Sequence, residues 1–277
     1  MIRDFSGQHL VIGGSGGLGQ ELVRQLADCP DVIEIVATYR SADPMALLQH
    51  SKVRYIKWEL GDEFSLREPG DKYDGIWIMT GACEVGLDAL SEESRRRMND
   101  VNWHGPLAII RRRTRLVKPD GLIVVLSSAA AWCPSTYGHW YSESKRRLMN
   151  ALRWYSGTQC LVFWAPGALD TGLWKDAPRF LQGLVKLQAA SANGTSVPDA
   201  VADLLRGVLA GEELILTTHD SKMSHRFPPL AWVMDWIMTA LIEEEAVMNG
   251  REVSPRLAGP LARLVASWLG PYLRRHA

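Results

Sequence analysis

Residues 11–19 of this chain read VIGGSGGLG, and this glycine-rich stretch decides the fold. An apolar run at residues 9–13 leads into it, and residues 18–27 follow with apolar side chains at the spacing of one helix face. This order predicts a strand, a tight turn and a helix. Glycine is required where a Cβ atom would block the turn or hold phosphate groups away from the backbone. We therefore predict that the helix N-terminus binds a dinucleotide pyrophosphate; glycines that serve only the turn are the alternative.

The rest of the chain repeats this alternation of short apolar runs and helical stretches. Ser91 is predicted to cap a helix, because Glu92 and Glu93 follow in the first turn. The predicted fold class is α/β, a Rossmann-like doubly wound parallel sheet of about seven strands with a C-terminal helical extension. The strands are predicted at residues 9–13, 33–38, 53–58, 75–79, 122–127, 160–164 and 213–217.

A polar stretch at residues 219–229, which ends in two prolines, is interpreted as the end of the catalytic core. Residues 1–220 are thus predicted to form the dinucleotide-binding and catalytic domain, and residues 221–277 a helical extension. Two apolar helices are expected there, at 230–248 and 256–275. Three roles stay open for residues 230–275: a lid over the substrate pocket, a subunit contact in a homo-oligomer, or a contact with a membrane surface.

Charge and cysteine usage exclude several classes of function. Lys plus Arg and Asp plus Glu both total 31, so the composition predicts no nucleic-acid partner. The four cysteines are far apart in the sequence, so we expect neither a metal site nor a disulfide framework. The N-terminus leaves no room for a signal peptide, and no apolar run reaches the roughly 18 residues that span a bilayer. A cytoplasmic location, with or without peripheral membrane contact, is the expectation.

The second predicted strand leads into Thr38, Tyr39 and Arg40, where an acidic residue would otherwise bind the adenosine ribose. That acid is missing. A guanidinium can bind a ribose 2′-phosphate with two hydrogen bonds, whereas NAD has no such group. The sequence therefore favours NADP(H) over NAD(H), and a solvated surface Arg40 is the alternative.

A candidate catalytic group follows the fifth predicted strand. Tyr141 and Lys145 lie one helical turn apart, so both side chains point from the same face. A neighbouring ammonium and a positive nicotinamide ring would bring the pKa of the phenol towards neutral pH. Ser128 lies thirteen positions before Tyr141, at the carboxyl edge of the sheet where ligands of such folds bind.

Across residues 7–218 the sequence resembles the short-chain dehydrogenase/reductase family. The matching motifs are the glycine loop, Thr80-Gly81-Ala82, the stretch 101–106, Ser128, Tyr141 with Lys145, Pro166-Gly167 and Asp170-Thr171. The resemblance implies that Tyr141 is the general acid/base and that Lys145 lowers its pKa and holds the nicotinamide ribose. It further implies that Ser128 polarises the carbonyl and that Asn102 supports a proton-relay water.

The same resemblance implies a set of cofactor-binding residues. Thr171 would bind the nicotinamide carboxamide, and Glu59 with Leu60 would lie at the adenine. The separation of Ser128 from Tyr141 matches the ordinary carbonyl-reducing branch, which selects the glycine spacing of that branch. The complete set is Gly13, Ser15, Gly16, Gly17, Leu18, Gly19, Tyr39, Arg40, Glu59, Leu60, Thr80, Gly81, Ala82, Tyr141, Lys145, Pro166, Gly167 and Thr171.

The chain also departs from the family pattern. Ile12 stands where a threonine usually opens the glycine loop, and Met79 replaces an asparagine, so some loop-locking hydrogen bonds are expected to be absent. There is little room for a helix between residues 62 and 74. Four tryptophans are expected near the cleft, although core packing is the preferred role of the third: Trp132, Trp140, Trp164 and Trp174.

The function predicted from these residues is hydride transfer between NADPH and a carbonyl or secondary alcohol of an apolar or ring-bearing small molecule. Two alternatives stay open. One is a non-redox enzyme on the same scaffold. The other is a cofactor-sensing or scaffold protein that binds a partner through its C-terminal helices.

Overall fold

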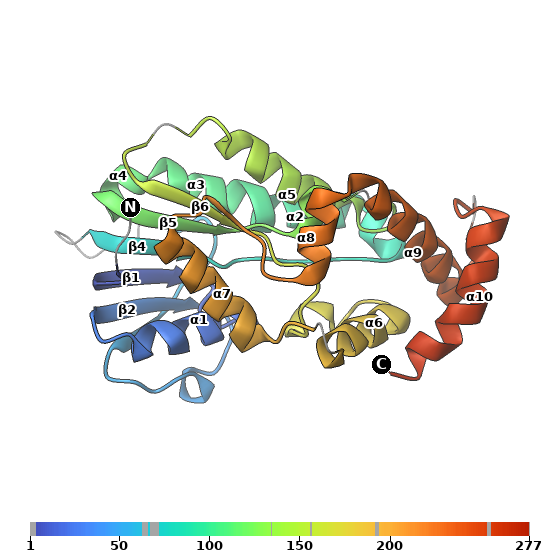
Figure 1. The fold of residues 1–277 in the computed structure, drawn as a ribbon, viewed down its shortest axis with the longest axis horizontal. Helices are drawn as coiled ribbons and strands as arrows, with labels where there is room; N and C mark the ends of the chain where they lie inside the picture. The colour runs from blue at the N-terminus through green and yellow to red at the C-terminus, as the bar shows by residue number, and fades with distance from the viewer. Residues whose placement is uncertain are drawn as a thin grey trace.

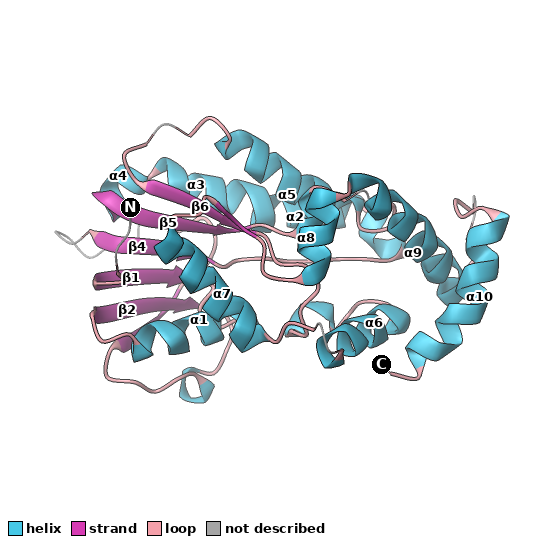
Figure 2. Ribbon diagram, viewed as in Figure 1, coloured by secondary structure: helices cyan, strands magenta, loops and turns pink. Residues whose placement is uncertain are grey.

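The computed structural model describes residues 4–62, 66, 72–133, 135–155, 157–191, 194–253 and 256–276, without the side chains of residues 228 and 230. Its centre is a seven-stranded, wholly parallel sheet with the strand order β3-β2-β1-β4-β5-β6-β7 (Figures 1 and 2). The strands are β1 (Gly7–Ile12), β2 (Val32–Tyr39), β3 (Val53–Lys57), β4 (Tyr73–Ile78), β5 (Val117–Leu126), β6 (Cys160–Trp164) and β7 (Leu214–Ile215). The predicted fold class and all seven strands are confirmed.

The strand order reverses between β1 and β4, because the chain first builds outward to β3 and then crosses back. In doubly wound sheets, ligands bind outside the carboxyl ends of the strands at this point. The glycine loop after β1 and Thr80 after β4 therefore lie at the expected edge. Most residues between 62 and 74 lie outside the described part of the chain, and so does the expectation that no helix fits there.

Helices cover both faces of the sheet. The helices are α1 (Gly17–Asp28), α2 (Glu92–Asn99), α3 (Gly105–Arg111), α4 (Arg113–Leu116), α5 (His139–Leu152), α6 (Arg179–Ala190), α7 (Val197–Ala210), α8 (His219–Arg226), α9 (Pro228–Met248) and α10 (Pro260–Arg274). Successive strand residues point to opposite faces: Val11 packs with α1 and α7, whereas Leu10 and Ile12 pack with α3 and α5. Both faces are buried, which explains why the central strands read as unbroken apolar runs.

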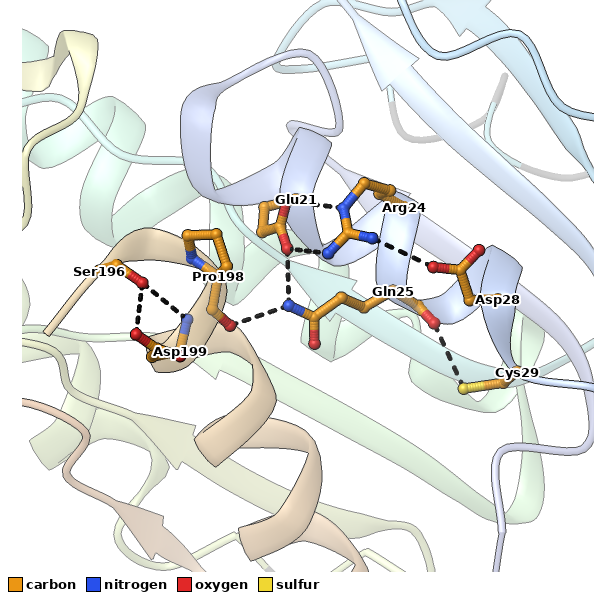
Figure 3. A network of polar contacts seen from close by, with 8 residues as sticks. All are labelled: Glu21, Arg24, Gln25, Asp28, Cys29, Ser196, Pro198 and Asp199. Atoms are coloured by element: carbon orange, nitrogen blue, oxygen red, sulfur yellow. Dashed lines mark hydrogen bonds and ion pairs between the residues drawn. The ribbon is translucent and has the colours of Figure 1, made fainter.

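A polar network fixes α1, the helix that follows the glycine loop, against α7 (Figure 3). The Gln25 side-chain amide donates to the Pro198 carbonyl oxygen at 2.8 Å and to Glu21 at 2.6 Å. Arg24 forms ion pairs with Glu21 and Asp28 along the same helix. Because α1 is held at its middle, its N-terminus keeps its place beside the loop.

The C-terminal helices pack on α6 and on the loop before α5, where they build a third core. Three carboxylates of α9 point inward and accept hydrogen bonds from the rest of the protein. Asp235 binds the backbone N–H and hydroxyl of Thr136, and Glu245 binds two backbone N–H groups at the start of α6. Glu243 accepts from the Tyr137 hydroxyl and from the backbone at residues 257 and 258. Helix α9 is thus bonded along its whole length.

The polar stretch at 219–229 was predicted as a break, and that prediction is wrong: residues 219–226 form α8. The Thr218 hydroxyl accepts from the Ser221 backbone N–H, and the Ser221 hydroxyl accepts from the Thr218 backbone N–H. A capping box normally shows Glu or Gln at its third position, so serine there hides the signal. Among the described residues, no helix is both long enough and apolar enough to cross a membrane.

Candidate active site

The glycine loop is shaped by close backbone contacts that only glycine permits. Gly13 has a φ of +85°, a region that side chains disfavour. A Cβ atom on Gly19 would lie 2.1 Å from the Gly13 carbonyl oxygen, and one on Gly17 would lie 3.4 Å from Thr171. At Gly16 the nearest atom would be 3.5 Å away, which is ordinary contact. The close approaches therefore belong to Gly13, Gly14 and Gly19, whereas a Cβ atom on Gly16 or Gly17 would make ordinary contacts.

We expect that Gly19→Ala destabilises the protein, whereas Gly16→Ala, the matched control in the same loop, does not. The Gly19 substitution forces the loop to open, because the clash is with backbone rather than with a movable side chain. A loss of about 2–4 kcal/mol in the free energy of unfolding is the expected size. Urea unfolding without cofactor measures it, and equal stability of the two variants would contradict the loop geometry.

The loop is locked by a residue from the next strand. The Gly13 backbone N–H donates to the Thr38 hydroxyl at 2.9 Å, and the Gly16 N–H donates to the Gly13 carbonyl at 3.1 Å. Thr38 on β2 therefore holds the start of the loop in place. The absence of the bonds that a threonine at position 12 would make stays a prediction.

The residues around this loop fit a dinucleotide phosphate chain. Helix α1 begins at Gly17 with Gly16 as its N-cap; no side chain caps it and no acidic residue lies in its first turn. Its first N–H groups therefore have no side-chain partner within the described helix and carry the positive end of the helix dipole. Arg40 follows the last residue of β2, is exposed, and has no ion-pair partner among the described residues. The N-terminus of α1 thus offers hydrogen-bond donors for a pyrophosphate, and Arg40 offers donors for a ribose 2′-phosphate.

Two hydroxyl groups meet at the carboxyl edge of β5. Ser128 follows this strand and Tyr141 lies in the first turn of α5, and both residues line the same cavity. The Ser128 oxygen also accepts from the Ala130 N–H at 3.2 Å, which fixes its direction. The Pro166 carbonyl accepts from the Ala129 N–H at 3.0 Å, so the loops after β5 and β6 are joined here. The structure thus brings together the predicted hydroxyl pair.

Lys145 lies beneath this pair with almost no exposed surface. Its Nζ donates to the Leu126 carbonyl oxygen at 3.0 Å. It lies 3.8 Å from the place that a Cβ atom added to Gly81 would take. Burial lowers the pKa of Lys145 to about 8. The ammonium therefore lies between the end of β5 and the loop after β4. Its contact with the nicotinamide ribose stays a prediction.

The surroundings of Tyr141 act on its pKa in both directions. Burial raises it above its ordinary value, the nearby Cys83 raises it further, and the Ser128 hydroxyl lowers it. The lowering by Lys145 together with a nicotinamide ring stays a prediction. At neutral pH the phenol keeps its proton, which suits a general acid.

Asn102 positions the loop after β4. It lies in a short π-helical turn, residues 100–104, and is fully buried. Its Oδ1 accepts from the Ala82 N–H at 3.0 Å, and its Nδ2 donates to the Ala82 carbonyl at 2.9 Å and to Ser144 at 3.2 Å. Both amide hydrogens are engaged, so the side chain holds Ala82 against α5. The proton-relay role of Asn102 stays a prediction.

Two residues of the site gave no sequence signal. Asp220 on α8 accepts from the Ala168 N–H at 2.9 Å, and Thr218 accepts from the Gly167 N–H at 2.8 Å, so both hold the loop after β6. The second Asp220 oxygen is buried and has no partner among the described residues.

Cys83 lies beside Tyr141 and Lys145, and burial raises its pKa to about 12, so it stays a neutral thiol.

The predicted adenine residues lie apart from this cluster. Glu59 and Leu60 follow β3 and are exposed, and the Leu60 side chain packs against Gly105. Thr80 has a buried hydroxyl with no partner among the described residues. The roles given to these residues stay predictions.

An apolar cavity of about 440 Å³ opens beside the Ser128–Tyr141 pair. Its walls are mainly aliphatic and sulfur-containing side chains from α6, α8 and α9: Leu181, Met223, Met234, Met238 and Ile242. Of the four tryptophans expected at the cleft, only Trp174 is among the described lining residues. Trp164 is core, as preferred, and Trp140 donates to the Leu90 carbonyl. The lining by α9 agrees with a role for the C-terminal helices in closing the pocket.

Among the described residues, no group of three or more His, Cys, Asp or Glu side chains gathers at metal-binding distance. All four cysteines are free thiols.

No model of a known protein family matches this sequence, and no curated protein matches it. Solved structures do share the fold. A short-chain dehydrogenase from Burkholderia cenocepacia J2315 in complex with NADP has a TM-score of 0.66 at 17% identity, over 84% of this chain and 98% of that chain. A short-chain dehydrogenase family protein from Francisella tularensis subsp. tularensis SCHU S4 has a TM-score of 0.63 at 18% identity, over 78% and 99%.

A third structure, the angucycline C-6 ketoreductase LanV with bound NADP, has a TM-score of 0.63 at 19% identity, over 78% of this chain and 95% of that chain. In this chain the glycine loop follows β1, Ser128 follows β5, and Tyr141 and Lys145 lie on α5. The chain therefore has the fold of the short-chain dehydrogenase/reductase family, which its sequence motifs resemble.

Proposed function

We propose that this protein is an NADP(H)-dependent short-chain reductase that converts a carbonyl group on an apolar or ring-bearing small molecule to an alcohol. The observation that carries the proposal is that Ser128 and Tyr141 line one wall of an apolar cavity, with buried Lys145 on the same helix as Tyr141. NADP-bound structures of the same fold support a nicotinamide cofactor. The bound cofactor would supply the hydride.

The side chains of this chain divide the remaining work. The hydroxyl groups of Ser128 and Tyr141 hold the substrate oxygen, and their donors are already oriented before it arrives. Tyr141 keeps its proton at neutral pH and gives it to the developing alkoxide. The methionines on the far wall exclude water and adapt to the shape of the substrate. A protonated Tyr141 is the form that reduction needs, and the concentrations of cofactor and substrate set the net direction.

Titration of the purified protein with NADPH and NADH, followed by nicotinamide fluorescence, tests the first half of the proposal. A panel of bulky ketones and aldehydes, followed at the NADPH absorbance band, tests the second half. Tight NADPH binding with carbonyl-dependent oxidation supports the reductase. Binding without turnover would instead favour a non-redox enzyme or a cofactor sensor.

We expect Arg40→Gln to weaken NADPH binding by about tenfold to a hundredfold and to leave NADH binding unchanged. Arg40 is exposed at the end of β2 and has no carboxylate partner among the described residues, so the 2′-phosphate would be its ligand. The matched control is Arg54→Gln, on the neighbouring strand, because Arg54 is already paired with Glu34. An equal loss of affinity for both nucleotides would contradict the 2′-phosphate contact.

A further inference from the structure

Helix α9 is apolar on the side that faces solvent. Three of its four carboxylates, Asp235, Glu243 and Glu245, point into the protein, as described above. Trp232 and Val233 in its first turns are 67% and 49% exposed, the reverse of the pattern of an ordinary surface helix. These carboxylates thus make internal contacts, while aromatic side chains of the same helix are exposed to solvent.

Helix α10 extends this surface. It packs inward with small residues, among them Ala262, Ala266 and Gly270, and carries its large apolar side chains outward. The outward residues follow each other at helical spacing and are all more than half exposed: Leu261, Leu264, Trp268 and Tyr272. Figure 1 shows α10 at the outer end of the molecule, farther from the sheet than α9.

The two exposed surfaces adjoin. The Trp236 ring lies within contact distance of Gly259, which precedes α10, and Trp236 itself is 36% exposed. We name the exposed apolar residues of this region the α9–α10 face: Trp232, Val233, Trp236, Leu261, Leu264, Trp268 and Tyr272. Contiguous apolar surface of this kind marks a contact with another molecule.

The charges around this face identify the contact. Residues 256–277 contain four arginines and neither Asp nor Glu. Arg263 and Arg275 have no ion-pair partner among the described residues. Glu244 of α9 interacts with Arg256 and Arg274. The α10 side of the rim is cationic, and this charge complements anionic lipid headgroups.

A second copy of the chain fits this rim poorly. In a two-fold interface the same patch lies on both subunits, so both sides of the contact would carry the arginines of α10. Like charges brought together in this way oppose association. Lipid headgroups meet the same surface with the opposite charge, and tryptophan side chains are favoured at the membrane interface.

We propose that the α9–α10 face docks onto an anionic membrane surface, with its tryptophans in the interfacial layer and its arginines at the headgroups. The mouth of the cavity lies at the same place. Met234 lines the cavity and is also 44% exposed, in the same helical turn as Trp232 and Val233. A carbonyl compound dissolved in the membrane then has a short path to Tyr141, a consequence that rests on the proposed function.

Flotation with lipid vesicles tests the docking. Vesicles of phosphatidylcholine alone are compared with vesicles of phosphatidylcholine mixed with phosphatidylglycerol, without cofactor or substrate. We expect the protein to float with the anionic vesicles only, and less as salt rises. The double substitution R263Q/R275Q should weaken partitioning about fivefold for each arginine removed.

Two further variants distinguish binding through the α9–α10 face from nonspecific adsorption through exposed tryptophans elsewhere. L264S/W268S, on the outward side of α10, should abolish flotation. W154S removes an equally exposed tryptophan, 83% exposed and placed after the end of α5, and should float like the original protein. Circular dichroism checks that each variant is folded.

Three results would overturn the proposal: no flotation with either vesicle, equal flotation of L264S/W268S and W154S, or a dimer in sedimentation that L264S/W268S dissociates. None of these measurements depends on turnover, so a failure of the proposed reductase function would remain distinguishable.

Discussion

Replacing Tyr141 by Phe is expected to lower the rate of carbonyl reduction by about a thousandfold while NADPH affinity stays nearly unchanged. The substitution removes the hydroxyl that gives up the proton and keeps the ring in place. Tyr141 borders the apolar cavity, whose aliphatic walls offer no other acid at this place. Single-turnover NADPH oxidation in the presence of a reducible ketone measures the effect.

The matched control for this variant is Tyr155→Phe. The Tyr155 hydroxyl bonds to Gln159 beyond the end of α5, away from the cavity. It should leave the reduction rate unchanged. A Tyr141→Phe variant that reduces ketones at the original rate would remove the general acid from the mechanism.

The second large effect concerns Lys145→Met. Turnover is expected to fall by about a hundredfold or more, because the ammonium that orders the cofactor side of the site is lost. The free energy of unfolding of this variant is expected to rise, whereas its turnover falls. Burial lowers the pKa of Lys145 from 10.5 to about 8, so the charged form is disfavoured in the folded protein.

The pH dependence of this stability effect has a defined sign. Between pH 8 and 10.5 the unfolded chain binds the Lys145 proton and the folded protein does not, so this lysine's destabilising effect is complete below pH 8 and disappears towards pH 10.5. The free energy of unfolding of Lys145→Met relative to the original protein should therefore decrease over this range, by an amount on the order of 3 kcal/mol.

Urea unfolding at several pH values measures this difference. The control is Lys118→Met, at the opposite end of β5, where the lysine is half exposed and bonded to Asp74. Because this lysine is not buried, Lys118→Met should not reproduce the change in stability expected of Lys145→Met. A pH-independent difference for Lys145→Met would mean that the ammonium is solvated rather than buried.

Local patterns in the sequence predicted the central part of the fold. Strands such as β1 and β4 are buried on both faces, so they are unbroken apolar runs that stand out from the amphipathic helices between them. The glycine loop was equally visible, because Gly13 and Gly19 meet backbone requirements that no other residue satisfies.

The parts that sequence reasoning missed depend on contacts between distant segments. Asp220 holds a loop more than fifty residues before it, and Glu245 caps a helix that begins at residue 179. Nothing at those positions shows such partners. Helix α8 escaped notice for a different reason, because its cap uses a serine in place of the usual acid.

The pKa of Tyr141 shows the same limit at the level of chemistry. The spacing of Tyr141 and Lys145 predicted that they share a helix face, and they do. Spacing does not show that burial dominates the phenol, or that Cys83 lies beside it. The direction of the pKa shift followed from the tertiary environment and not from the motif.

The most direct test of the central claim is transfer of deuterium from labelled NADPH. The protein is incubated with a reducible ketone and with NADPH deuterated on one or the other face of the nicotinamide C4, and the alcohol is analysed by mass spectrometry. The account predicts that one isotopomer alone places deuterium on the carbinol carbon. Tight NADPH binding with no deuterium in any product, across a broad panel of ketones and aldehydes, would contradict it.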